Sequence, residues 1–287
     1  APLNVACGAA KLGGRAAIIT MLGRALFGDF LEHTMVEHGI ELAGVRRTDQ
    51  ALTALAFVAL DDQGERTFSF YRKPCADQLL GPTDIEAALF DARLDAFHFG
   101  SISLISEPSG SATRFAAARA RSVGAWVSYD PNLRERLWPD LETARRTMLD
   151  AMPLADIVKV SDSELCFLTG HDGQPGAAAL LRMGPTIIVV TRGARGCVIY
   201  RDGAPPIEAA APTVEVVDTT GAGDAFVAAF LDALVRSGIN DAGALTASVL
   251  EQAATWGNAA GALATTKHGA IPSLPSRAEV SALLGVP

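Results

Sequence analysis

Residues 217–226 are the stretch of this chain whose residue types and spacing best support chemistry. They read Val-Asp-Thr-Thr-Gly-Ala-Gly-Asp-Ala-Phe, after a run rich in β-branched residues and before an apolar-patterned helix that we expect from about Gly223. This order places a strand, a glycine turn and a helix N-terminus next to one another. The unpaired N–H groups and the positive end of the helix dipole would then form a site for a phosphate or a developing oxyanion.

Asp224 lies beside these N–H groups and is a candidate proton acceptor. An anion hole next to a base is what phosphoryl transfer to a hydroxyl group requires. The alternative is structural, because an acidic residue in the first turn of a helix is usually a cap or a dipole partner.

The elements that must position this turn alternate between strands and helices. Strands are expected at 16–22, 54–60, 67–71, 95–99, 125–129, 156–160, 186–191 and around Val214, with a hairpin-like stretch at 196–207. Helices are expected at 4–12, 27–38, 84–92, 107–122, 139–152, 174–183, 223–236, 240–266 and 277–284. The alternation predicts an α/β fold with a mostly parallel sheet and helices on both faces. The runs at 54–60 and 67–71, joined by residues 61–64, predict a small β-hairpin.

Polar residues and glycines follow the expected strands, where ligands bind in parallel sheets. They occupy positions 100–101, 130–134, 161–164, 191–193 and 218–224. Lys159 ends a strand of apolar neighbours, where an unpaired ammonium would be costly, so we expect a phosphate or carboxylate partner for it. Each of the others has a structural alternative. Asp130 and Asn132 could build a turn, Arg134 could be a surface residue, and Glu164 could be a first-turn helix charge.

The composition narrows the function classes. The chain has 287 residues, 49% of them hydrophobic and 20% charged, with a net charge of −8. These values predict a globular protein and argue against nucleic-acid binding through a basic surface. The four cysteines form no C-x-x-C pair, so we expect reduced thiols in a cytoplasmic protein with no membrane span. P-loop, dinucleotide-binding, G-x-S-x-G and H-E-x-x-H motifs are absent.

Several segments together resemble the PfkB-type (ribokinase-like) sugar kinases, and among them the fructokinases. The matching segments are 217–226 (the signature DTTGAGDAF), 128–134 with 137–138 (the fructokinase DPNLR…LW pattern), 159–164 with 167–170 (the KVSD-E-FLTG stretch), and 258–261 with 265–272 (the fructokinase tail). The resemblance covers essentially the whole chain. It implies a single ribokinase-like α/β domain over 1–287, with a small β lid inserted at 47–75.

Two features depart from the family pattern. The family normally begins with a strand that bears a sugar-binding aspartate, followed by a Gly-Gly pair, and both are missing before Ala1. We therefore expect a domain that lacks its first strand. Arg24 and Ala25 also stand where relatives usually carry acidic residues.

The resemblance implies phosphoryl transfer from ATP to D-fructose, giving fructose 6-phosphate and ADP, with Mg²⁺ and, as in some relatives, K⁺. Asp224 would be the catalytic base, and the anion hole would be formed by the N–H groups of Gly221, Ala222 and Gly223. The implied sugar contacts are Asn4, Arg72, Asp130, Asn132 and Arg134. The implied ATP contacts are Lys159, Glu164, Thr191, Gly193, Gly196 and Asn258, with Glu164 also holding Mg²⁺ through water. The implied K⁺ site comprises Asp218, Thr220, Gly269 and Ser273.

Two other functions stay open at this point. Arg72 and Arg134 could clamp a substrate carboxylate, which would make the protein a 2-keto-3-deoxygluconate kinase. A kinase-like protein that binds nucleotide and sugar without turnover is the alternative from another class. The resemblance also implies a homodimer through the lid.

Overall fold

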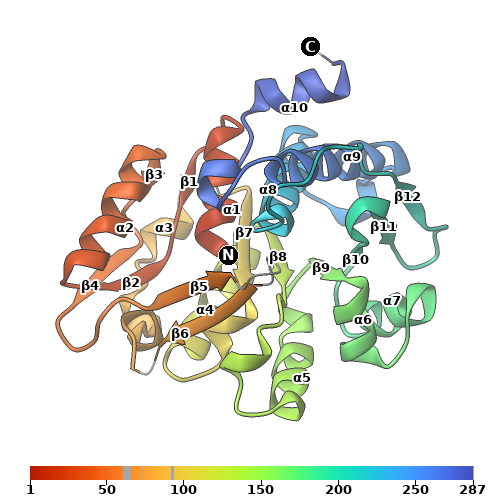
Figure 1. Cartoon of the computed structure of the whole chain (residues 1–287). Helices are drawn as coiled ribbons and strands as arrows, with labels where there is room; N and C mark the ends of the chain where they lie inside the picture. Colours follow the sequence, from red (N-terminus) through yellow and green to blue (C-terminus); the bar gives the residue numbers. More distant parts are fainter. Residues whose placement is uncertain (61–65, 73, 92–93, 287) are drawn as a thin grey trace.

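Six strands form the central sheet of the computed structural model, which describes residues 1–60, 66–72, 74–91 and 94–286 (Figure 1). In spatial order the strands are β12 (Ile207–Ala209), β11 (Cys197–Tyr200), β10 (Ile187–Thr191), β9 (Ile157–Ser161), β8 (Trp126–Asp130) and β7 (Ala96–Gly100). Strands β7 to β10 pair in parallel, whereas β11 is antiparallel to both of its neighbours. The carboxyl ends of the four parallel strands therefore lie along one edge of the sheet.

Helices cover both faces of this sheet (Figure 1). One face carries α1 (Pro2–Lys11), α8 (Ala222–Arg236), α9 (Ala247–Ala264) and α10 (Arg277–Leu284). The other carries α4 (Ser109–Ser122), α5 (Leu141–Asp150), α6 (Asp162–Thr169) and α7 (Gly173–Leu181). Alternate residues of β10 pack on opposite faces of the sheet. Ile187 and Val189 are buried against the helices of the first face, and Ile188 and Val190 against those of the second. The predicted mostly parallel sheet with two covered faces is confirmed.

Smaller sheets lie in the first third of the chain. Strand β1 (Ala16–Ala17) pairs in parallel with β3 (Ile40–Glu41), and β2 (Thr20–Gly23) pairs in parallel with β4 (Val45–Thr48), with α2 (Leu26–Glu37) between them in the chain. Strands β5 (Leu55–Leu60) and β6 (Arg66–Tyr71) form the predicted antiparallel hairpin, in which Leu55 pairs with Tyr71. The predicted turn at 61–64 lies outside the described residues.

Three predicted elements are wrong in type or extent. The single strand at 16–22 is two short strands with a break at residues 18–19. The helix at 84–92 is a 3₁₀ turn (Pro82–Asp84) followed by α3 (Ala88–Asp91), because Asp84 accepts the Gly81 N–H at 2.7 Å and closes a tight turn there; residue 92 lies outside the described residues. The helix at 240–266 begins only at Ala247, where the Thr246 hydroxyl caps it.

The predicted strand around Val214 is also wrong. Residues 210–216 belong to no strand, and Val216 and Val217 are exposed. Pro212 has no N–H to donate to a ladder. The N–H groups of Val217 and Asp218 instead donate to the carbonyl of Thr265 at the end of α9, at 2.8 and 3.0 Å. The approach to the glycine turn is thus held by a helix end rather than by the sheet.

Helix α6 was not predicted, although its sequence signal is present. The Ser161 hydroxyl accepts the Glu164 N–H, while the Glu164 carboxylate accepts the Ser161 N–H. This reciprocal pair is a capping box, whose S-x-x-E pattern marks the start of a helix.

Candidate active site

The glycine turn places the start of α8 at the carboxyl edge of the sheet. Gly221 precedes the helix with φ of 84°, a left-handed conformation that favours glycine. A Cβ on Gly221 would also lie 3.1 Å from the Cα of Ala270. The Ala222 N–H donates to the Thr219 carbonyl at 3.3 Å and the Ala225 N–H to the Gly221 carbonyl at 2.8 Å. The N–H groups of Gly223 and Asp224 come too early in the helix to have an intrahelical carbonyl partner. The arrangement suits an anion.

Asp224 sits in this first turn and is held by Asn4. It is 9% exposed, and its Oδ2 accepts a hydrogen bond of 2.7 Å from Asn4 Nδ2 on α1. Helices α1 and α8 touch at Gly8, where a Cβ would lie 2.6 Å from the Cβ of Ala228. The close contact between the helices thus holds Asn4 against the candidate base. The structure places Asn4 on Asp224, whereas a sugar contact for Asn4 stays a prediction.

Lys159 has the carboxylate partner that its apolar strand predicts. Its Nζ lies 3.0 Å from Asp130 Oδ2, with 11% of the lysine side chain and 3% of the aspartate side chain exposed. A Cβ on Gly223 would lie 3.2 Å from Lys159 Nζ, so the ammonium also touches the first turn of α8. The other oxygen of the aspartate, Oδ1, has no hydrogen-bond partner among the described residues. Asp130 and Lys159 therefore link β8, β9 and α8.

The charges of this cluster shift one another's pKa values. Burial raises the pKa of Asp130 to about 6 against the attraction of Lys159, and Glu164 and Asp224 raise it further. Burial alone would lower the pKa of Lys159, but the attraction of Asp130, Glu164 and Asp224 outweighs it and raises that pKa. The lysine is therefore an ammonium, and its positive charge lies beside Gly223 in the first turn of α8.

Glu164 joins the same cluster from α6. Burial opposes its ionisation, but Lys159 and three hydrogen bonds favour it, so its pKa is lowered. Its Oε1 accepts the Leu133 N–H at 2.8 Å, and its Oε2 accepts both the N–H and the hydroxyl of Ser161 at 2.8 and 2.9 Å. Glu164 is thus both a helix cap and a buried anion at the strand ends.

The protein groups at this position could hold Mg²⁺ only through bridging water molecules. Three of the roughly four lone-pair positions on the Glu164 carboxylate are occupied by protein donors. Within the described ranges, no three His, Cys, Asp or Glu side chains come together as a directly ligated metal would need. Mg²⁺ keeps several waters when it binds beside phosphates, so one charged carboxylate is a sufficient protein contribution.

Asp218 closes the other side of the glycine turn. Its Oδ1 accepts the Thr220 N–H at 2.6 Å, and its Oδ2 accepts the Gly269 N–H at 2.9 Å. Ser273, 1% exposed, donates its hydroxyl to the Ala270 carbonyl at 2.8 Å. The four residues predicted to enclose K⁺ therefore belong to two segments that Asp218 ties together, while ion binding itself stays a prediction.

The predicted nucleotide contacts lie around the β10–β11 turn. Thr191 donates its hydroxyl to the Val160 carbonyl at 3.3 Å. Gly193 and Gly196 have positive φ, and a Cβ on Gly196 would lie 2.0 Å from the Ala209 carbonyl oxygen, so only glycine fits there. Asn258 on α9 donates its amide to the same carbonyl oxygen at 2.9 Å. In the structure Asn258 holds the segment after β12; contact with adenine stays a prediction.

Two of the predicted sugar contacts are the arginines Arg72 and Arg134. Arg134 is exposed and donates to the Leu133 carbonyl at 3.0 Å.

Two neighbours of the predicted site residues were missed by sequence reasoning. Arg72 forms an ion pair with Asp77 in the 3₁₀ turn Ala76–Leu79, and no motif in the sequence pointed to that aspartate. Ser161 binds Glu164, and its S-x-x-E spacing could have identified it. Asn132 has φ of 46°, which supports a turn at that position.

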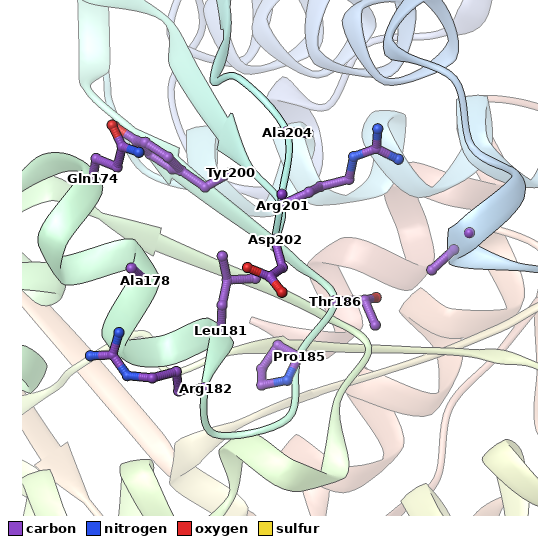
Figure 2. Close-up of a pocket in the computed structure, with 13 residues that line it drawn as sticks. Gln174, Ala178, Leu181, Arg182, Pro185, Thr186, Tyr200, Arg201, Asp202 and Ala204 are labelled. Atoms are coloured by element: carbon purple, nitrogen blue, oxygen red, sulfur yellow. The ribbon is translucent and has the colours of Figure 1, made fainter.

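A separate depression lies at the opposite edge of the sheet. It has a volume of about 1040 Å³ and is lined by residues including Arg182 and Thr186, which precedes β10. Figure 2 shows the Arg201 side chain pointing away from Leu181 and Asp202, which also line this depression. None of the predicted site residues lines it.

Fold and site together define a kinase that acts on a small hydroxyl-bearing substrate. Residues 1–277 match the model of the protein family described as "pfkB family carbohydrate kinase". The chain belongs to the pfkB family of carbohydrate kinases. The predicted family and the ribokinase-like fold are thereby confirmed.

Relatives in sequence and in structure agree with this assignment. Fructokinase-1 of Zea mays is 46% identical over 290 residues, covering 99% of this chain and 87% of the relative. The fructokinase of Xylella fastidiosa with bound ATP has a TM-score of 0.91 at 36% identity, covering 98% of this chain and 88% of that one. The fructokinase of Vibrio cholerae O395 with fructose, ADP and calcium has a TM-score of 0.87 at 37% identity, covering 98% and 89%. No helix in the described part of the chain combines the length and apolar character that crossing a bilayer needs.

Proposed function

We propose that this protein is a fructokinase, which transfers the γ-phosphoryl group of ATP to the primary hydroxyl of D-fructose and releases fructose 6-phosphate and ADP. The observation that carries the proposal is the position of Asp224 in the first turn of α8, held by Asn4 beside the helix N-terminus. The names of the relatives reported above support fructose as the acceptor.

Asp224 acts as the general base in this proposal. Asn4 engages Oδ2, which leaves Oδ1 to take the proton of the sugar hydroxyl as its oxygen attacks the γ-phosphorus. The N–H groups at Gly221, Ala222 and Gly223 stabilise the negative charge on the transferring group. Lys159 adds a fixed positive charge beneath Gly223. In the structure the Ala222 N–H donates to the Thr219 carbonyl at 3.3 Å, so in this proposal it would exchange that partner for the phosphate.

The sugar would bind beside Asp130 at the carboxyl end of β8. Asp130 Oδ1 has no described partner and is suited to accept a sugar hydroxyl. Asn132, Arg72 and Arg134 would contribute further polar contacts, with the hairpin of β5 and β6 covering them as a lid.

The nucleotide would bind along the β10–β11 turn, at Thr191, Gly193 and Gly196, with Asn258 behind them. Mg²⁺, held by Glu164 through water, would neutralise charge on the phosphates when bound. The proposal also includes a K⁺ site formed by Asp218, Thr220, Gly269 and Ser273.

A homodimer through the lid is proposed as well. In the lid, Phe57 and Tyr71 are exposed and their ring centres are 5.4 Å apart.

A second candidate, 2-keto-3-deoxygluconate kinase, is favoured by one observation. Two arginines, Arg72 and Arg134, stand among the implied sugar contacts, so a substrate carboxylate could be bound between them. Binding without turnover is disfavoured because the residues that the proposed transfer needs are present, with Gly221 before α8 and Asp224 in its first turn.

ADP release with Mg-ATP and a panel of D-fructose, 2-keto-3-deoxygluconate, ribose and glucose tests the proposal. Turnover specific to fructose is the expected result. Turnover specific to the keto-acid would replace fructose by the second candidate. Thermal shifts with both Mg-ATP and fructose but no ADP from any sugar would instead establish a non-catalytic binding protein.

A further inference from the structure

One face of α1 contacts the catalytic elements along its whole length. Asn4, Gly8 and Lys11 are spaced i, i+4 and i+7, so they share a helix face. The first two contact α8, as described above. Lys11, the last residue of α1, donates its ammonium to the carbonyls of Ile271 and Leu274, at 3.0 Å each.

The segment that Lys11 holds is the one that supports the glycine turn. Gly269 donates its N–H to Asp218, and Ala270 lies against Gly221, where a Cβ would be 3.1 Å from the Ala270 Cα. Ser273 donates both its hydroxyl and its N–H to the Ala270 carbonyl, at 2.8 and 3.2 Å, which folds the segment into a compact turn. A shift of residues 270–274 would therefore displace the turn that presents the α8 N–H groups.

We propose that Lys11 is a positioning residue for phosphoryl transfer, which fixes the segment 270–274 against Gly221 and thereby sets the geometry of the anion site. Its two hydrogen bonds are charge-assisted and join the end of α1 to that segment. A single helix then positions both the base, through Asn4, and the anion site, through Lys11. This inference rests on the proposed function for its kinetic consequence only.

The test compares Lys11→Met with wild type, with Lys11→Arg as the conservative variant and Arg277→Met as the control. Arg277 donates to the Leu12 carbonyl at 2.8 Å and pairs with Asp232, so its loss disturbs the same region through partners other than the carbonyls that Lys11 binds. The readouts are steady-state kcat and KM and the amide hydrogen exchange of peptides that cover 219–224 and 269–276.

We expect Lys11→Met to lower kcat by about 10- to 100-fold with little change in KM for the sugar, since small displacements of catalytic groups act mainly on the rate. Exchange in both peptides should become faster, Lys11→Arg should retain most of both properties, and Arg277→Met should leave both peptides unchanged. Wild-type exchange at 219–224 in Lys11→Met, or an equal loss of kcat in Arg277→Met, would overturn the proposal. If wild type phosphorylates no sugar, the proposed function fails, and the exchange comparison still decides the role of Lys11.

Discussion

Asn4 and Asp224 are 220 positions apart in the chain and are joined by a hydrogen bond of 2.7 Å. The bond connects the first turns of two helices that pack closely at Gly8. One carboxylate oxygen of Asp224 is thus fixed by an amide, and in the proposed reaction the other oxygen takes the proton. An amide donor orients a carboxylate without neutralising it, which is the requirement for a base that must stay ionised.

Replacing Asn4 should therefore slow the reaction. We expect Asn4→Ala to lower kcat by about 10- to 100-fold, because the carboxylate of Asp224 loses the donor that sets its orientation. Initial rates with saturating ATP and sugar measure the effect. Asn4→Ser, which keeps a shorter donor, should lie between wild type and Asn4→Ala. A wild-type kcat in the alanine variant would show that Asp224 needs no such support.

The buried pair of Lys159 and Asp130 should be strongly coupled. Removing one partner leaves an uncompensated charge, so we expect Lys159→Met to lower the free energy of unfolding by about 3 to 5 kcal/mol. In the double variant with Asp130→Asn, the loss should be smaller than the sum of the single losses. Urea unfolding of the four proteins completes the cycle. Additive losses would mean that the pair is not coupled.

Activity should also depend on the protonation of Asp130. Its pKa is raised to about 6, so the fraction of protonated, neutral Asp130 increases as the pH falls through that value. Lys159 then loses its charged partner. We expect kcat/KM for the sugar to fall below about pH 6. A rate profile from about pH 5 to 8 measures this limb, which should be missing in Asp130→Asn. If kcat/KM of the Asp130→Asn variant decreases over the same pH range, the titrating group is not Asp130.

Alanine substitutions at Gly221 and Gly203 can distinguish the effect of backbone strain from the effect of a contact with Ala270. Both have positive φ, but a Cβ on Gly203 has nothing within 4 Å, whereas one on Gly221 would lie 3.1 Å from Ala270. Replacement by alanine should cost about 1 to 2 kcal/mol of stability at either position. Only Gly221→Ala should also reduce kcat. Equal activities at equal stability loss would mean that the contact with Ala270 does not shape the anion site.

The sequence was sufficient for features that depend on local pattern. The alternation of strands and helices, the β5–β6 hairpin and the turn before α8 follow from residue periodicity and from glycine and polar residues near each strand end. The need of Lys159 for a charged partner also follows from its apolar strand alone.

Features that depend on distant parts of the chain could not be predicted. The run around Val214 has the residues of a strand, but the Thr265 carbonyl, about fifty positions away, binds the N–H groups that follow it. The partner of Asn4 is 220 positions distant. Which carboxylate pairs with Lys159 likewise depends on how β8 lies beside β9.

The most direct test of this account is ADP release from Mg-ATP and D-fructose by wild type and by Asp224→Asn. Asparagine keeps the shape of the side chain but cannot take the hydroxyl proton. We predict that fructose-dependent turnover in the variant falls by about two to four orders of magnitude while its thermal unfolding stays close to that of wild type. Turnover in Asp224→Asn close to that of wild type would contradict the central claim that Asp224 is the base.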